Sequence, residues 1–265
     1  MLRRLLFAIL LFGAATTARA LEYTDVYFNT DEPGWGLFLV QSDTFQFVAF
    51  FIYGPDGKPV WYTAELTNDG TGTYSGPLYV TTGSYFADPW DPSKVVSTQV
   101  GTASFSPADL YRATLTYALT GGPTVTKSVQ RQTLTGYPLA GNYSGSLAGT
   151  VTGCNDPSKN NNAFRGRYSL AVTQVGDTSA TLTFTFVDTN NAGLVCTLAG
   201  TLTHLGRLYQ VAGAQYSCTG TGAAPGTYAA NIEVFHPTGQ GIEGRWSAPV
   251  NDGCVHGFRF AAVHL

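Results

Sequence analysis

In residues 45–53 the character of the side chains follows a period of two. The odd positions are all apolar or aromatic: Phe45, Phe47, Ala49, Phe51 and Tyr53. The even positions begin polar at Gln46 and become apolar from Val48 onward. Successive side chains of a β-strand point to opposite faces, so we expect one face of this strand to be buried throughout and the other over its second half. A strand buried on both faces belongs inside a barrel or sandwich rather than at an open edge.

Turn residues bound this strand on both sides. Gly54-Pro55-Asp56-Gly57 is typical of a tight turn, because proline fixes φ and glycine accepts a positive φ. The chain then returns through residues 59–66, and Pro33-Gly34 separates the first strand from another at 35–41. The pattern therefore predicts three adjacent antiparallel strands.

The same alternation and the same turn residues recur along both halves of the chain. In the first half they predict strands at 22–28, 35–41, 44–53, 59–66, 72–80, 95–104, 109–119 and 123–134. In the second half they predict strands at 142–151, 164–175, 179–188, 194–204, 207–218, 227–236, 241–249 and 255–264. Short strands in series with tight turns favour up-and-down connections.

We therefore expect an all-β protein of two antiparallel meander domains, each of about eight strands, folded as an up-and-down barrel or a sandwich. The likeness to lipocalins and avidins is one of architecture and implies no ligand. The segment 136–141 is the expected linker, which gives an aromatic-rich, acidic domain at 21–136 and a cysteine-bearing domain at 137–265. A single large sandwich is the alternative.

Residues 1–20 have the pattern of a secretory signal peptide. Arg3 and Arg4 precede the apolar run 5–15, and Ala18-Arg19-Ala20 is a small-x-small cleavage site. No later apolar run is long enough to cross a bilayer, so we expect no membrane insertion. The expected location is outside the cytoplasm, either periplasmic or extracellular.

The charge of the remaining chain argues against several classes of partner. Taking the three arginines of the signal peptide from the 14 basic residues leaves 11 against 17 acidic residues, a net charge of −6 (11 − 17). Residues 21–69 hold eight Asp and Glu against the single Lys58. Binding to phosphate needs a basic footprint, so we expect neither nucleic acid nor an anionic membrane surface as a partner.

Four cysteines lie in the second half, and an exported chain favours disulfides between them. Cys196 and Cys218 flank a hairpin that turns at Leu205-Gly206, so folding it brings the two side by side. We favour a Cys196–Cys218 disulfide, with Cys154–Cys254 as the outer pair. By restricting the unfolded chain, the Cys196–Cys218 bond should stabilise the fold by about 3 kcal/mol. A metal site is the alternative, but the spacing lacks C-x-x-C and paired histidines.

Three segments of the first half resemble a module that recurs in exported proteins of Gram-negative bacteria. They are Asp31-Glu32-Pro33-Gly34-Trp35-Gly36, Ala49-Phe50-Phe51-Ile52-Tyr53-Gly54 and Gly57-Lys58-Pro59-Val60-Trp61-Tyr62. The resemblance covers roughly residues 22–135 and implies export and a domain boundary. Such modules have no established activity, so the resemblance implies no chemistry.

Aromatic and acidic residues of the first domain are the candidate binding site. Trp and Tyr join a flat apolar face to a polar edge, which suits sugar rings, peptides or apolar small molecules. Asp88 and Asp91 lie beside Trp90 on an irregular loop at 83–94 and could accept hydrogen bonds from a ligand. The candidate ligand-binding residues are Trp35, Trp61, Tyr62, Tyr79, Trp90, Asp88 and Asp91. The alternative for Trp35 and Trp61 is a role in the core.

No catalytic motif occurs: the chain has no G-x-S-x-G elbow, H-E-x-x-H, phosphate loop or calcium loop. Glu32 with Glu65 is the one carboxylate pair worth testing as the acid and base of a polysaccharide hydrolase. We expect instead an exported, non-catalytic, monomeric protein that binds a glycan, a peptide or an apolar small molecule and needs no cofactor or metal. A protein that docks or inhibits another protein is the further alternative.

Overall fold

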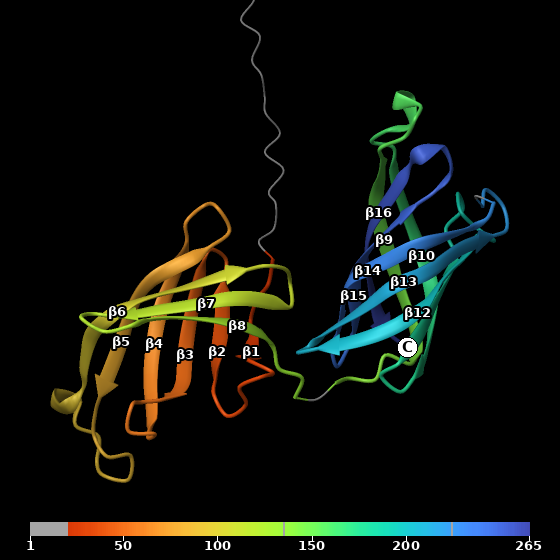
Figure 1. Ribbon diagram of the computed structural model, residues 1–265. Helices are drawn as coiled ribbons and strands as arrows, with labels where there is room; N and C mark the ends of the chain where they lie inside the picture. The colour runs from red at the N-terminus through yellow and green to blue at the C-terminus, as the bar shows by residue number, and fades with distance from the viewer. Residues whose placement is uncertain (1–20, 135, 224) are drawn as a thin grey trace, which may run out of the picture.

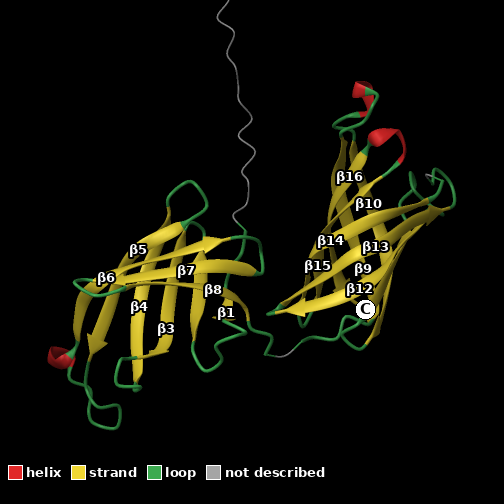
Figure 2. Cartoon of the chain, viewed as in Figure 1, coloured by secondary structure: helices red, strands yellow, loops and turns green. Residues whose placement is uncertain are grey.

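A computed structural model of the chain describes residues 21–134, 136–223 and 225–265. The signal peptide expected over residues 1–20 lies outside the described residues. Most of the described chain is strand, arranged as two antiparallel barrels joined by an irregular segment (Figures 1 and 2). Both are up-and-down barrels, because the order of strands in each sheet follows the order in the sequence. The structure thus confirms the all-β class with two meander domains.

The first barrel contains eight strands. They are β1 (Asp25–Phe28), β2 (Gly36–Ser42), β3 (Phe45–Tyr53), β4 (Pro59–Asn68), β5 (Tyr74–Thr82), β6 (Val96–Pro107), β7 (Arg112–Leu119) and β8 (Thr124–Arg131). Closure is brief, since β1 meets β8 only at Tyr27–Arg131 and Phe28–Gln130. The seam of this barrel therefore depends on side chains as well as on backbone pairing.

The second barrel also contains eight strands. They are β9 (Gly141–Thr152), β10 (Ala163–Val175), β11 (Ser179–Phe186), β12 (Val195–Leu205), β13 (Leu208–Thr219), β14 (Thr227–Pro237), β15 (Gly241–Pro249) and β16 (Val255–His264). Its seam is long, with β16 and β9 paired from Val255–Thr152 to His264–Tyr143. The irregular segment between the barrels runs from the end of β8 to the start of β9 and contains the linker expected at 136–141.

Helix is confined to three short 3₁₀ segments among the described residues: η1 (Pro92–Lys94), η2 (Pro157–Lys159) and η3 (Asn251–Gly253). Within the described chain, no helix has the length and apolar character needed to cross a membrane.

The interior of each barrel is filled by the apolar positions of the alternation. In β11, Leu182 and Phe184 are fully buried, while the alternating Thr181, Thr183 and Thr185 are half-buried on the outward side. In the first barrel Leu37, Phe50 and Phe105 belong to one buried cluster. This one-sided burial is the pattern expected for closed antiparallel sheets with a solvated exterior.

The expected burial of both faces of residues 45–53 is wrong. Gln46, Val48 and Phe50 point into the first barrel and are fully buried. Phe45 and Phe47, on the face expected to be buried throughout, are 40% and 42% exposed. Register with β2 and β4 fixes which face of β3 points inward, and this choice buries the polar Gln46 while leaving phenylalanines outside.

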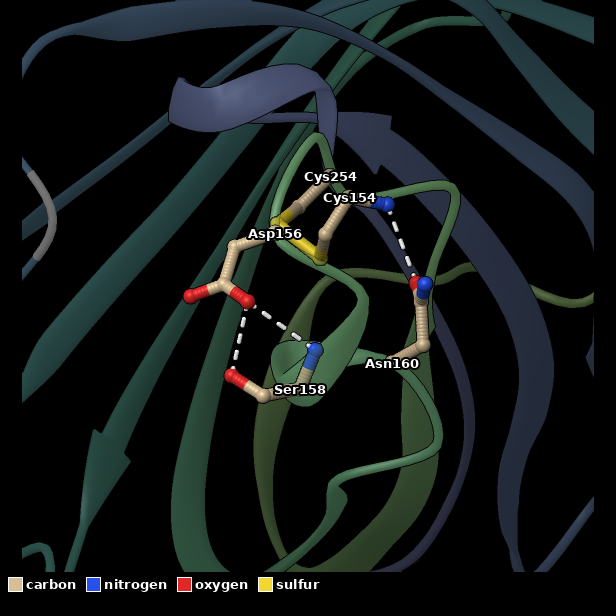
Figure 3. The surroundings of a disulfide bond; sticks show 5 residues. All are labelled: Cys154, Asp156, Ser158, Asn160 and Cys254. Atoms are coloured by element: carbon tan, nitrogen blue, oxygen red, sulfur yellow. Dashed lines mark hydrogen bonds between the residues drawn. A yellow bond between two sulfur atoms is a disulfide. The ribbon is translucent and has the colours of Figure 1, made fainter.

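Both disulfides pair as expected from the sequence. Cys196 and Cys218 are direct register partners on β12 and β13 and form one disulfide. The other links Cys154 to Cys254 and joins the β9–β10 loop to the end of η3 (Figure 3). In that loop Asn160 Oδ1 accepts a hydrogen bond from the Cys154 amide at 2.9 Å. Such covalent links fit an oxidising compartment.

The barrels contact one another through the β12–β13 turn (Figure 1). There the Arg207 guanidinium donates to the Thr24 carbonyl at 2.6 Å, and the Arg207 amide donates to Asp25 Oδ2 at 3.1 Å. A Cβ at Gly206, whose φ is +65°, would lie 2.4 Å from Asp25 Oδ2, so only glycine fits this close approach. Tyr111 donates from its hydroxyl to the Glu233 carbonyl at 2.6 Å, and burial raises its pKa to about 12.

Candidate functional site

The up-and-down order gathers four connections of the first barrel at one end. The β1–β2, β3–β4, β5–β6 and β7–β8 connections share this end because neighbouring strands run in opposite directions. The opposite end carries Tyr111, Thr24 and Thr133, all of which bond to the second barrel. The first end is therefore the open mouth, a common position for ligand sites in barrels.

A cavity of about 240 Å³ lies in this mouth. Its apolar floor is formed by Phe50, Ile52, Leu115 and Val125. The remaining lining residues are Glu32, Trp35, Tyr53, Tyr117 and Lys127. The cavity thus combines an apolar floor, three aromatic side chains with polar edges, and one acidic and one basic group.

The acidic and basic groups bind each other. Lys127 donates from Nζ to Glu32 Oε1 at 2.7 Å, and the Trp35 indole donates to Glu32 Oε2 at 3.1 Å. The hydrogen bond from Lys127 is the main reason why the pKa of Glu32 lies below its ordinary value. Both carboxylate oxygens are occupied, so Glu32 fixes the orientation of the Trp35 ring at the cavity rim.

Tyr117 belongs to the aromatic lining of the cavity, and Tyr62 packs against the core next to it. The rings of Tyr62 and Tyr117 lie 6.3 Å apart, and the Tyr117 ring meets the edge of Phe50 at 6.2 Å. Burial raises the pKa of Tyr117, so this hydroxyl stays protonated and can donate a hydrogen bond at neutral pH. A ligand in the cavity would meet flat apolar faces and a small number of donors.

The residues singled out from the sequence are spread over the first barrel. Trp35 lines the cavity, and Tyr62 packs against the core beside it. Trp61 is 60% exposed on the outer wall, and Tyr79 is half-buried on β5. Trp90 is 71% exposed on the β5–β6 connection. The three tryptophans expected together thus occupy three different surroundings.

The two acids beside Trp90 have different roles. Asp91 Oδ1 accepts hydrogen bonds from the Ser93 amide and hydroxyl at 3.0 and 2.6 Å, which caps η1. Asp88 is exposed on the same loop. Capping accounts for Asp91 without a ligand, and neither acid lines the cavity.

The hydrolase pair proposed from the sequence does not form. Glu32 lies at the barrel mouth in contact with Lys127, whereas Glu65 is exposed on β4 between the buried Ala64 and Leu66. Alternation along β4 directs Glu65 away from the interior, so the two carboxylates do not flank a common site. Among the described residues, no group of three or more His, Cys, Asp or Glu side chains is placed to hold a metal ion.

Sequence reasoning missed the contribution of β7 and β8 to the cavity. Leu115, Tyr117, Val125 and Lys127 line it opposite Glu32 and Trp35. A signal was present, because Lys127 falls on the same inward-facing positions of β8 as Val125 and Val129. A charged residue on an inward-facing position requires a partner, and barrel closure supplies Glu32.

The two sides of the outer surface of the first barrel differ in polarity. Its exposed positions on β2, β3 and β4 are mostly apolar, with Ser42, Glu65 and Thr67 as polar exceptions, whereas those on β7 and β8 are mainly Thr and Ser. We call the apolar residues of the former set, together with the half-buried Phe51, the apolar wall; it comprises Phe38, Val40, Phe45, Phe47, Phe51, Tyr53 and Trp61. Register makes the set continuous, since Val40 faces Phe47 and Phe51 faces Trp61. Contiguous exposed apolar patches of this kind mark interaction surfaces.

Comparison with known proteins adds no further information about the site. No protein-family model matches the chain, and no curated protein matches it.

Proposed function

We propose that the protein is a non-catalytic binding protein that works outside the cytoplasm and holds a small, mainly apolar ligand in the mouth of its first barrel. The cavity of about 240 Å³ lined by Trp35, Tyr117 and an apolar floor carries this proposal. The volume is below the range of about 300–1,000 Å³ usual for drug-sized ligands, which favours a single ring system over a long lipid chain. Two disulfides support a location in an oxidising compartment.

The polar groups of the rim restrict the chemistry of that ligand. Glu32 and Lys127 neutralise each other, so a ligand gains little from a net charge of either sign. Lys127 retains donors beyond the bond to Glu32, and the Tyr117 hydroxyl is protonated at neutral pH. We therefore expect a planar or cyclic apolar compound with one accepting oxygen, such as a phenol or a cyclic alcohol.

Filling the cavity is expected to abolish binding. Val125→Phe places an aromatic ring in the cavity. We expect it to weaken the binding of 2-naphthol, measured by calorimetry, at least tenfold. Thr126→Phe is the matched control, because Thr126 is the exposed neighbour of Val125 on β8 and leaves the cavity unchanged. Overpacking costs about 1–3 kcal/mol of stability, so thermal unfolding of both variants verifies folding. Equal binding by Val125→Phe and the native protein would refute the site, as would failure of 2-naphthol, indole and cyclohexanol to bind the native protein.

A second candidate function, docking of a protein partner, is favoured by the apolar wall. Phe47 lies on β3, the middle strand of the wall, Trp61 lies on β4 opposite Phe51, and Glu65 lies beside Phe47 in the same outward row. A two-fold contact between copies would bring the Glu65 carboxylates of two walls toward each other in an apolar setting, which is unfavourable. Charge complementarity therefore favours a partner that presents basic and apolar side chains.

Removing two aromatic side chains of the wall is expected to prevent such docking. We expect Phe47→Ser with Trp61→Ser to weaken binding of a peptide alternating lysine and leucine at least tenfold, measured by fluorescence anisotropy. Phe86→Ser, which removes a fully exposed ring from the β5–β6 connection, is the control. Equal binding of a glutamate–leucine peptide would contradict the charge argument. Wall-dependent dimerisation in ultracentrifugation would show that a second copy is the partner instead.

A further inference from the structure

Most of the basic residues of this chain have a partner within the protein. Of the 11 Lys and Arg beyond the signal peptide, seven pair with a carboxylate. Lys159 also has a partner. Arg165, Arg167 and Arg259 remain, and within the described residues their guanidinium groups have no hydrogen bond or ion pair.

These three arginines share one face of the second barrel. Arg165 and Arg167 are exposed on β10, and Arg259 is exposed on β16, with β9 between the two strands. Ala148 is the register partner of both Arg165 and Arg259. Strand spacing therefore puts the backbone positions of Arg165 and Arg259 about 10 Å apart, and those of Arg165 and Arg167 about 7 Å apart.

A groove of about 590 Å³ runs along the same face. Small residues form its floor, because Ser144, Ser146 and Ala261 occupy the exposed positions of β9 and β16 there. Arg167 forms one side of the groove, and Gln240 and Glu243 lie on the other. Arg165 and Arg259 lie one row further along the strands, so the groove leads from hydroxyl and amide groups toward three unpaired positive charges.

We infer that this groove binds an acidic oligosaccharide, with Arg165, Arg167 and Arg259 contacting its carboxylate or sulfate groups. Guanidinium groups bind carboxylates and sulfates through paired N–H donors. Their spread over three strands matches anionic groups repeated along a chain better than one isolated ion. Ser144, Ser146 and Gln240 supply partners for sugar hydroxyls.

The composition of the groove disfavours nucleic acid. Glu243 contributes a carboxylate to its wall, which repels a continuous row of phosphates but accepts hydrogen bonds from hydroxyls. The aromatic residue among the lining side chains is Tyr168, whose buried hydroxyl donates to the Ala261 carbonyl, so its ring offers no surface for base stacking.

The test uses the mature, disulfide-bonded chain and tetragalacturonate as the probe. We expect calorimetric binding that weakens as salt rises, and no binding of the methyl-esterified tetramer, which has the same shape without the charges. Arg167→Gln is expected to weaken binding roughly ten- to hundredfold, because a hydrogen bond to a charged group is lost. Arg165→Gln and Arg259→Gln should each weaken it less.

Arg112→Gln is the matched control, since Arg112 is exposed in the first barrel and pairs with Asp109. It should leave tetragalacturonate binding unchanged. Absence of binding to the native protein would overturn the inference, as would unchanged binding by a variant with all three arginines replaced. Inorganic sulfate binding as tightly as the tetramer would overturn the oligosaccharide assignment, and tighter binding of single-stranded DNA would replace it with nucleic acid. These outcomes are independent of the cavity in the first barrel, which contains none of these residues.

Discussion

Replacing Arg131 with methionine is expected to lower the free energy of unfolding of the first barrel by about 3–5 kcal/mol, because the buried Asp25 carboxylate loses its closest cationic partner. The Arg131 side chain is fully buried, and its Nη1 donates to Asp25 Oδ2 at 2.8 Å. It also donates to the carbonyls of Leu110, Thr24 and Glu22. Since β1 and β8 share only two register pairs, these bonds reinforce a short backbone seam.

Hydrogen exchange resolved by peptide is the appropriate measurement, because a chain of two barrels need not unfold in one step. Arg112→Met is the control: its exposed pair with Asp109 should contribute no more than about 1 kcal/mol. Arg131→Lys should also be destabilising, since lysine cannot reproduce the planar fork. Arg131→Met combined with Asp25→Leu should cost less than Arg131→Met alone, because the buried carboxylate that loses the Arg131 guanidinium is removed as well. A loss below about 1 kcal/mol for Arg131→Met would contradict this account of the seam.

Removing the Cys154–Cys254 disulfide is expected to destabilise the second barrel by about 4–5 kcal/mol, through the larger entropy of the unfolded chain. This disulfide spans 100 residues, whereas Cys196–Cys218 spans 22 and should contribute about 3 kcal/mol. We therefore expect Cys154→Ala/Cys254→Ala to lower the midpoint of thermal unfolding more than Cys196→Ala/Cys218→Ala.

The first barrel is the internal control for this experiment, because all four cysteines lie in the second. Exchange protection of residues 21–131 should be the same in both double variants and in the native chain, apart from the segments that contact Arg207. The opposite order of the two effects would show that packing around Cys196, which is buried beside Tyr216, outweighs loop length.

The strands were predictable because their signal is local. Alternation of apolar residues and turn residues such as Gly54 to Gly57 act over a few positions, and they gave sixteen strands in the expected order. The pairing of Cys196 with Cys218 followed from the same hairpin, although a β-bulge between Ala199 and Thr201 shifts the register by one residue and brings the two cysteines directly opposite. The separation into two domains was likewise readable from the linker.

Which face of each strand points into the barrel was less predictable. Both faces of residues 45–53 are apolar, so hydrophobicity alone does not decide between them, and the face richer in phenylalanine turned out to form the apolar wall. The cavity depended on closure of the barrel: Lys127 and Tyr117 come within reach of Trp35 only when β8 meets β1. Of the residues singled out from the sequence as candidates, Trp35 and Glu32 line it.

The sequence by itself determined the strands, their up-and-down order and the Cys196–Cys218 disulfide, because these depend on alternation, turns and hairpins that span few residues. The Cys154–Cys254 disulfide followed because only these two cysteines were left to pair. Tertiary structure alone decided which side chains point inward and which charges find partners. The reason is physical: closing a sheet joins residues about a hundred positions apart, as with Asp25 and Arg131, and no local pattern encodes such a contact. The same closure brought Arg165, Arg167 and Arg259 to one face of the second barrel, where their guanidinium groups have no ion pair among the described residues.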